Sequence, residues 1–213
     1  MNISNFKNVY ILAPHTDDGE LGAGGTISKL IESGSNVYYF AFSTASKSVP
    51  KGYAKDILKT EVINSTSVLG IPRKNLYIYN YEVRRLKESR QEILEDLIEK
   101  RKICNPDLVL LPSLNDIHQD HQTIAREGVR AFKKTSILGY ELIWNNLSFN
   151  TTAMVEISKD QLDKKIKSLS EYKSQSSREY MNREFIKSLA RVRGVQFGSK
   201  YAECFEVIRW IIK

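Results

Sequence analysis

This chain of 213 residues contains only two cysteines and lacks a long apolar run. A membrane-spanning helix needs an apolar stretch of roughly 18 residues or more. The first residues, MNISNFKN, include no apolar segment of the kind found in signal peptides. Cys104 and Cys204 form no CxxC motif, so we expect reduced thiols rather than a disulfide. These absences predict a cytoplasmic protein without a transmembrane segment.

Positive charge exceeds negative charge, with a formal net charge of +7 and a pI of about 9.3. Residues 159–193 contribute ten Lys or Arg against five Asp or Glu. A solvated helical face accounts for such a segment most simply. An anionic substrate, such as a nucleotide-linked sugar, or an acidic membrane surface would also use it. Aromatic residues are not interleaved with the basic ones as in nucleic-acid modules, so no nucleic-acid partner is expected.

Short apolar segments alternate with amphipathic ones through the first two-thirds of the chain. We expect strands at 8–13, 37–42, 76–79 and 108–111, and helices at 23–33, 54–69, 88–103 and 121–133. This alternation predicts an α/β fold, a Rossmann-like and mostly parallel sheet with helices on both faces. The later pattern is looser, with strands near 137–143, 152–157 and 202–211 and helices near 160–173 and 178–192. We expect this C-terminal segment to cap the sheet within a single domain of residues 1–213.

The stretch 9–27, VYILAPHTDDGELGAGGTI, joins a buried strand to a glycine-rich helix start. His15, Asp17 and Asp18 follow the strand directly, at the sheet edge where open α/β folds bind ligands. The glycine run 22–25 could cradle a phosphate at a helix N-terminus. Its spacing is not GxGxxG, and two acids occupy the approach, so close helix–strand packing is the better interpretation.

A second motif, NDIHQDH at 115–121, follows the strand 108–111. In the doubly wound order the first and fourth strands are neighbours, so both motifs should face one crevice. The only histidines of the chain, His15, His118 and His121, all lie in these two motifs. Two imidazoles and one carboxylate with an open position form a known catalytic zinc arrangement. The competing interpretations are backbone capping by His15, helix capping by the two aspartates and a surface helix start for the other histidines.

The two motifs, PHTDDGELGAGG and HQDH, resemble those of the LmbE-like (PIG-L) N-deacetylase family. The resemblance extends to Leu69-Gly70-Ile71 and to the C-terminal pattern Arg193-Gly194…Gly198…Tyr201-Ala202-Glu203…Phe205, and so covers nearly the whole chain. It implies the LmbE-like fold, a Zn²⁺ cofactor and removal of an acyl group from an N-acylated amino sugar, often one derived from N-acetylglucosamine.

The resemblance also implies roles for individual residues. His15, Asp18 and His121 would be the zinc ligands. Asp17 would be the general base that takes a proton from water on the metal and later passes it to the leaving amine. A protonated His118 would stabilise the oxyanion, and Asp120 would orient an imidazole.

Several positions depart from the family pattern. Thr16 replaces the usual proline, and Gly19 stands where a glutamate commonly follows the aspartates. Some members carry a substrate-binding arginine three residues before a glutamate of the second helix. Here Glu61 fits that pattern, but position 58 is leucine. Arg84 or Arg85 could take the place of this arginine in binding the substrate. Four further residues are candidates for the pocket wall: Tyr140, Trp144, Asn145 and Asn146.

The sequence therefore predicts a zinc-dependent N-deacetylase acting on a small amino-sugar substrate. Two alternatives stay open: an amidase or deformylase that cuts another N-acyl group, and a non-catalytic family member that binds a sugar nucleotide. The identity of the sugar is not readable. Neither is the oligomeric state, and a homo-oligomer stays open.

Overall fold

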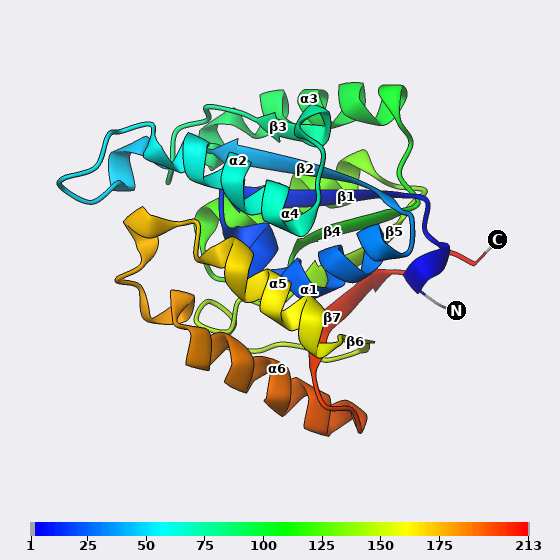
Figure 1. The fold of residues 1–213 in the computed structure, drawn as a ribbon. Coiled ribbons are helices and arrows are strands. Elements are labelled where there is room, and N and C mark those ends of the chain that lie inside the picture. The colour runs from blue at the N-terminus through cyan, green and yellow to red at the C-terminus, as the bar shows by residue number, and fades with distance from the viewer. Residues whose placement is uncertain (1–2, 213) are drawn as a thin grey trace.

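A seven-stranded sheet runs through residues 3–212, the part of the chain that this computed structural model describes (Figure 1). Its strand order is β3-β2-β1-β4-β5-β7-β6. The strands are β1 Asn8–His15, β2 Asn36–Ser43, β3 Leu76–Ile78, β4 Leu108–Pro112, β5 Ser136–Tyr140, β6 Ala153–Glu156 and β7 Ala202–Arg209. The first five are parallel, whereas β7 runs antiparallel to both β5 and β6. The predicted mostly parallel sheet is confirmed.

Six α-helices cover both faces of the sheet (Figure 1). They are α1 Asp18–Glu32, α2 Ile57–Leu69, α3 Arg90–Ile103, α4 Gln119–Ala131, α5 Lys159–Leu169 and α6 Arg183–Phe197. Helices α3 and α4 pack together on one face, and α1 and α2 pack with α5 on the other.

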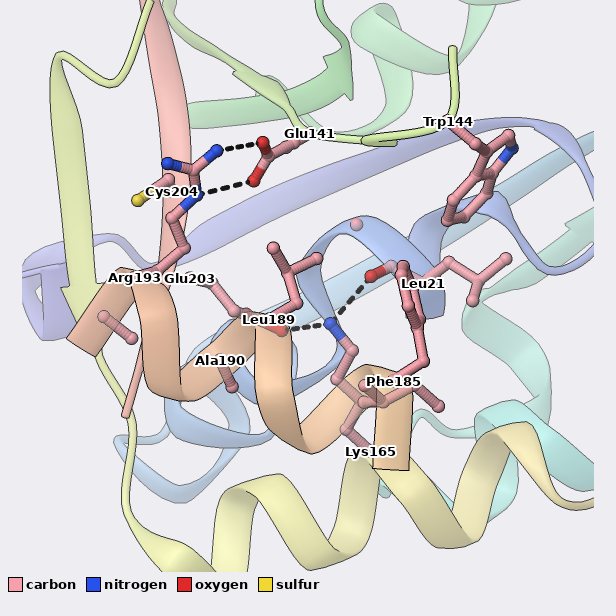
Figure 2. Close-up of a pocket in the computed structure, with 13 residues that line it drawn as sticks. Leu21, Glu141, Trp144, Lys165, Phe185, Leu189, Ala190, Arg193, Glu203 and Cys204 are labelled. Carbon is pink, nitrogen blue, oxygen red and sulfur yellow. Dashed lines mark hydrogen bonds and ion pairs between the residues drawn. The ribbon is translucent and has the colours of Figure 1, made fainter. Parts of the chain in front are cut away.

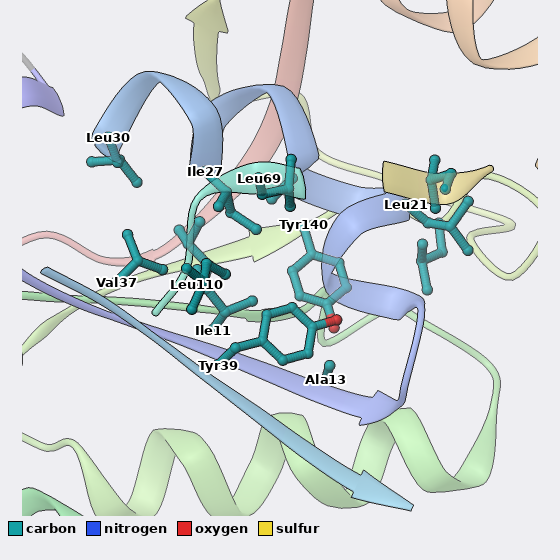
Figure 3. Packing of buried hydrophobic residues seen from close by; sticks show 14 of the residues in the cluster. Ile11, Ala13, Leu21, Ile27, Leu30, Val37, Tyr39, Leu69, Leu110 and Tyr140 are labelled. Atoms are coloured by element: carbon teal, nitrogen blue, oxygen red, sulfur yellow. The ribbon is translucent and has the colours of Figure 1, made fainter. Parts of the chain in front are cut away.

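The central strands are apolar at nearly every position because helices bury both of their faces. Along β1, Val9, Ile11 and Ala13 belong to the hydrophobic cluster under α1, whereas Tyr10 and Leu12 belong to the cluster under α3 and α4. Figure 3 shows part of the first cluster. Burying an aliphatic side chain completely contributes about 1.5–3 kcal/mol, so these alternating contacts fix the register that places the ends of the strands.

Two predicted boundaries near the first motif were wrong. Strand β1 does not end at residue 13 but continues to His15, which pairs with Ser43 of β2. Helix α1 begins at Asp18 rather than near residue 23, and its backbone departs from helical geometry at Ala23. The glycine run therefore lies within α1, and Ala23 is its one non-helical residue. A Cβ atom at Gly22 would collide with the Tyr140 ring, which explains close packing at this point.

The C-terminal segment joins the main sheet, because β6 and β7 extend it beyond β5. Helix α6 begins at Arg183 and not near 178, since Asn182 caps it by accepting from the backbone amide of Glu184. Both cysteines are free, as predicted. Among residues 3–212, no helix has the length and apolar character needed to cross a membrane; the cytoplasmic location stays a prediction.

Candidate metal centre and its cavity

The two histidine-bearing motifs meet at one edge of the sheet. Strands β1 and β4 are parallel neighbours, with Tyr10 opposite Val109, so their carboxyl ends lie side by side. His15 is the last residue of β1, and Asp18 is the first residue of α1. The loop after β4 leads into α4, whose first turn contains His121. The predicted convergence of residues about a hundred positions apart therefore occurs.

Three side-chain atoms form a small triangle at this edge. His15 Nδ1 lies 3.1 Å from Asp18 Oδ2, His121 Nε2 lies 3.3 Å from that same oxygen, and the two ring nitrogens are 3.2 Å apart. Ligands bonded to tetrahedral Zn²⁺ at about 2.0 Å would be separated by about 3.3 Å. The spacing of these three atoms therefore fits the ligand set of a zinc site.

The other nitrogen of each imidazole in the triangle faces a buried carboxylate. His15 Nε2 lies 3.0 Å from Asp120 Oδ2, and His121 Nδ1 lies 2.7 Å from Asp116 Oδ2. Metal-binding histidines are commonly oriented by such carboxylate partners. Sequence analysis gave Asp120 this kind of role but assigned none to Asp116. The only sequence signal for Asp116 is its place in the NDIHQDH motif, five residues before His121.

His118 stands beside the triangle as the N-cap of α4. The three imidazoles each place a nitrogen within 4.8 Å of the others, so this cluster could hold a metal. However, His118 Nδ1 accepts a hydrogen bond from the backbone amide of Asp120 at 3.2 Å. Only its Nε2 is free, which makes the tighter triangle with Asp18 the better ligand set.

The charge of His118 differs from the expectation. Burial, followed by the neighbouring imidazoles of His121 and His15, lowers the pKa of His118 to about 4. The acceptor role of Nδ1 leaves the single proton on Nε2. His118 is thus a neutral hydrogen-bond donor, and the protonated form expected from the sequence is not favoured.

The adjacent aspartates have opposite pKa shifts. Burial and then the nearby Asp18 carboxylate raise the pKa of Asp17 to about 6. For Asp18 burial acts upward, but the imidazoles of His121 and His15 outweigh it and hold its pKa well below the usual range. Asp17 occupies the N-cap position of α1 without making a side-chain capping bond, so the capping interpretation does not apply to it.

A buried polar cluster supports the loop that carries both aspartates. The Thr16 carbonyl accepts from the Tyr39 hydroxyl at 2.9 Å and from the Tyr172 hydroxyl at 2.7 Å. Both hydroxyls also contact the fully buried Glu20 carboxyl. The Gly19 amide donates to the Tyr39 hydroxyl at 3.1 Å, and a Cβ atom at Gly19 would lie 2.6 Å from that ring. Glycine at this departure from the family pattern thus makes room for Tyr39.

A cavity of about 210 Å³ opens above the triangle. Asp17, Asp18 and all three histidines line it. Three of the predicted substrate residues also line it, namely Arg84, Trp144 and Asn145. Leu58 lies on this wall as well, so the departure from the family's arginine falls on the cavity itself. Sequence reasoning missed a further group, for which no motif gave a signal: Ser48, Gln175, Arg178 and Tyr180.

Three predicted wall residues lie elsewhere, and one of them, Asn146, accepts from the Leu142 backbone amide at 2.8 Å and does not line the cavity. Tyr140 is fully buried in the core, where its hydroxyl donates to the Leu12 carbonyl at 2.9 Å (Figure 3). Arg85 is exposed and pairs with Glu88 and Glu82, outside the cavity wall. Tyr140 was misassigned because an aromatic residue at a strand end fits a core as well as a pocket. Arg85 was misassigned because the chain turns at Arg84, which separates the two side chains.

A smaller cavity of about 30 Å³ lies behind the first, and Leu21 and Trp144 line both (Figure 2). Lys165 Nζ reaches into it and lies 2.7 Å from both the Leu21 carbonyl and Glu203 Oε1. Glu203 in turn accepts from the amides of Gly25 and Thr26. The ion pair of Lys165 and Glu203 therefore forms hydrogen bonds with backbone groups of α1 before and after Ala23, where the helix is irregular.

Comparison with known proteins shows the family of this chain and solved structures with a similar fold. Residues 10–132 match the family described as PIG-L, GlcNAc-PI de-N-acetylase. A diacetylchitobiose deacetylase of Thermococcus kodakarensis is 24% identical over 228 residues, which cover 94% of this chain and 82% of that protein. An N,N'-diacetylchitobiose deacetylase structure from Pyrococcus horikoshii has a TM-score of 0.79 at 21% identity, over 97% of this chain and 85% of that one.

The fold also occurs in proteins with another reaction. A 4-carboxy-2-hydroxymuconate hydratase structure from Pseudomonas putida is similar with a TM-score of 0.79 and 16% identity, over 97% of this chain and 98% of that one. Because folds host several chemistries, the reaction has to be argued from the site.

Proposed function

The chain belongs to the PIG-L family of de-N-acetylases, and from this premise we propose that it is a zinc-dependent hydrolase that removes the N-acetyl group from an N-acetylated amino sugar. The observation that carries the proposal is the triangle of His15, Asp18 and His121, whose ligand atoms lie 3.1–3.3 Å apart in a cavity that Asp17 also lines.

In this proposal His15 Nδ1, Asp18 Oδ2 and His121 Nε2 would hold a zinc ion. A bound zinc ion supplies a Lewis acid that lowers the pKa of water and polarises the acetamide carbonyl. Asp120 orients the His15 imidazole through Nε2, and Asp116 orients the His121 imidazole through Nδ1.

Asp17 takes a proton from the attacking water and later passes it to the leaving amine. A carboxyl group with its pKa raised to about 6 suits both tasks near neutral pH. The Nε2–H group of His118 donates a hydrogen bond to the oxyanion that develops on the carbonyl oxygen. Acid–base help of this type contributes about 10²–10⁴-fold, and one oxyanion donor contributes about 10²–10³-fold.

The residues of the cavity wall favour a sugar as the substrate. Trp144 presents an aromatic surface, which suits the apolar face of a sugar ring. Arg84 and Asn145 are the polar candidates for holding its hydroxyl groups or substituents.

The decisive experiment measures acetate release across N-acetylated sugars and sugar conjugates, with and without a chelator. Zinc-dependent acetate release is expected for at least one of them. Release of formate or a larger acid instead would favour the amidase alternative. Absence of any hydrolysis from the zinc-loaded protein would favour the non-catalytic alternative.

A further inference from the structure

A carboxyl group lies inside the core two residues after Asp18, and the reaction described above gives it no part. The Glu20 side chain is fully buried and does not line the cavity. Its Oε1 atom accepts hydrogen bonds from Ser65 Oγ at 2.7 Å and from the Tyr172 hydroxyl at 2.9 Å, and its Oε2 atom contacts the Tyr39 hydroxyl. We call these four residues the Glu20 cluster.

Packing alone does not explain the Glu20 cluster. Its members come from α1, β2, α2 and the segment after α5, and none of them is more than 1% exposed. Burying a carboxyl group and three hydroxyl groups costs free energy unless each is hydrogen-bonded, whereas apolar side chains fill the same volume without this cost. Exchange of buried charged groups for well-packed apolar ones is often neutral or stabilising. A role in function is therefore the better explanation of this polar arrangement.

The Glu20 cluster is linked to Asp17 through the peptide group between Thr16 and Asp17. The Thr16 carbonyl accepts from the hydroxyls of Tyr39 and Tyr172, so each hydroxyl lies between this carbonyl and the Glu20 carboxyl. Because a peptide group is planar, the Thr16 carbonyl and the Asp17 amide share one plane. Hydrogen bonds that hold the carbonyl therefore also hold the backbone of Asp17.

Asp17 depends on its backbone for its direction. Its side chain makes no capping hydrogen bond, and its φ of −104° and ψ of −11° lie at the point where the chain passes from β1 into α1. On the far side of Asp17, the Gly19 amide donates to the Tyr39 hydroxyl. A general base has to lie within hydrogen-bond reach of the proton that it takes. A displacement of about 1 Å can lower a rate about 100-fold.

We propose that Glu20 is a positioning residue for Asp17, because its carboxyl group holds the two tyrosine hydroxyls against the Thr16 carbonyl and so fixes the direction in which Asp17 faces the cavity. This inference rests on the proposed function, in which Asp17 transfers the proton. Glu20 and the tyrosines do not line the cavity. Loss of the cluster should therefore lower kcat and leave KM and zinc binding nearly unchanged.

The test removes single hydroxyl groups from the zinc-loaded protein. We expect Tyr39→Phe and Tyr172→Phe each to lower kcat about 10–100-fold, the cost of a displaced catalytic group, while KM and the Kd for zinc change less than about twofold. Tyr140→Phe is the matched control, because this buried hydroxyl donates to the Leu12 carbonyl and has no contact with Thr16 or Glu20; Figure 3 shows Tyr39 and Tyr140. An equal loss of kcat in the control, or a loss of zinc that accounts for the lower kcat, would overturn the proposal.

Substitution of Glu20 itself tests the carboxyl group. Glu20→Gln should retain more of kcat than Glu20→Leu, because only the amide can still hydrogen-bond to the hydroxyls. Equal kcat values in these two variants would contradict the role of Glu20. The phenylalanine variants decide the question if Glu20→Leu does not fold.

A double substitution separates positioning of Asp17 from general support of the fold. Groups that act as a unit are not additive in their effects on kcat. In the Asp17→Asn background, Tyr39→Phe should therefore lower the residual kcat by about twofold or less. A further loss as large as that of Tyr39→Phe in the parent protein would show that the hydroxyl does not act through Asp17.

A measurement without substrate separates failure of this inference from failure of the proposed function. If no sugar is hydrolysed, the proposed function fails, and amide hydrogen exchange then tests whether the cluster holds the loop. The amides of Gly19 and Leu21 report on it, since they donate to the Tyr39 hydroxyl and the Asp17 carbonyl. Both should exchange about tenfold faster in Tyr172→Phe than in Tyr140→Phe, as expected when local opening becomes easier. Equal exchange rates in the two variants would refute the positioning role.

Discussion

Asp17 and Asp18 are chemically identical neighbours in the sequence, yet their surroundings give them different properties. Asp18 faces two imidazoles, which favour its charged form, whereas Asp17 faces the cavity without a capping bond. Environments that separate the pKa values of two acids commonly mark different catalytic roles. The difference arises from where each side chain points, since adjacent residues at the start of a helix project in different directions.

The roles of the two acids can be tested separately. We expect Asp17→Asn to lower kcat by about 10²–10⁴-fold, the range for acid–base help, while zinc content by elemental analysis stays the same. Asp18→Asn is the comparison and should lose zinc, because the triangle then lacks its charged oxygen. Retained turnover in Asp17→Asn would remove Asp17 as the base.

Asp116 provides a second test at the residue scale. Its carboxylate lies 2.7 Å from His121 Nδ1 and is almost fully buried. We expect Asp116→Ala to weaken zinc binding by about 10–100-fold, as for other carboxylate partners of metal-binding histidines. Competition with a chromogenic chelator measures the affinity. Asp160→Ala, on the exposed start of α5, is the control and should bind zinc as the parent does. Equal affinities in the two variants would exclude the orienting role.

At the scale of elements, α1 depends on a buried ion pair from α5 and β7. Lys165 and Glu203 have side chains only 8% and 5% exposed, and together they satisfy Leu21, Gly25 and Thr26 of α1. Because Asp18 begins this helix, the pair also contributes to the position of the metal centre. Through this ion pair the C-terminal segment helps to position α1 in addition to covering the sheet.

Breaking this pair should destabilise the protein strongly. Removing one partner of a buried pair leaves the other charge uncompensated and typically costs about 3–5 kcal/mol. We therefore expect Lys165→Met to lower the free energy of unfolding in denaturant by about that much. In a double-mutant cycle, Lys165→Met with Glu203→Gln should cost less than the sum of the single variants. Strict additivity would contradict a coupled pair.

At the scale of the molecule, one sheet carries both hydrophobic clusters and both motifs. We propose that residues 1–213 fold as one domain, so thermal unfolding should show one transition. Zinc at about 100 times its Kd should stabilise the folded state by about 2.7 kcal/mol. For a chain of this size, that corresponds to a rise in Tm of about 5–10 °C relative to the chelator-treated protein.

The same measurement on His121→Ala provides the control. This variant keeps the other two atoms of the triangle but lacks a ligand, so the rise in Tm on adding zinc should largely disappear. An equal rise in the variant would place the ion elsewhere. Two separate transitions in the parent protein would contradict the single domain.

The fold class and the meeting of the motifs were predictable from the sequence for one reason. Alternating strands and helices allow few topologies, and in the doubly wound order β1 and β4 must be neighbours. His15 ends β1 and His121 lies shortly after β4, so the local pattern and the topology were sufficient to predict that they meet. Two strand ends beside the motifs were misjudged, that of β1 by two residues and that of β4 by one, because a proline near the end of a strand does not stop the pairing as it would in the middle.

The sequence by itself determined that β1 and β4 are neighbours, the edge at which chemistry occurs and the residue types gathered there. Only the tertiary structure decided that Asp116 orients His121, that Tyr140 lies in the core and that Arg178 reaches the cavity. Those outcomes depend on contacts between segments distant in the sequence and on the direction of single side chains. Neither these contacts nor these directions follow a repeating pattern along the chain, so the local sequence does not reveal them.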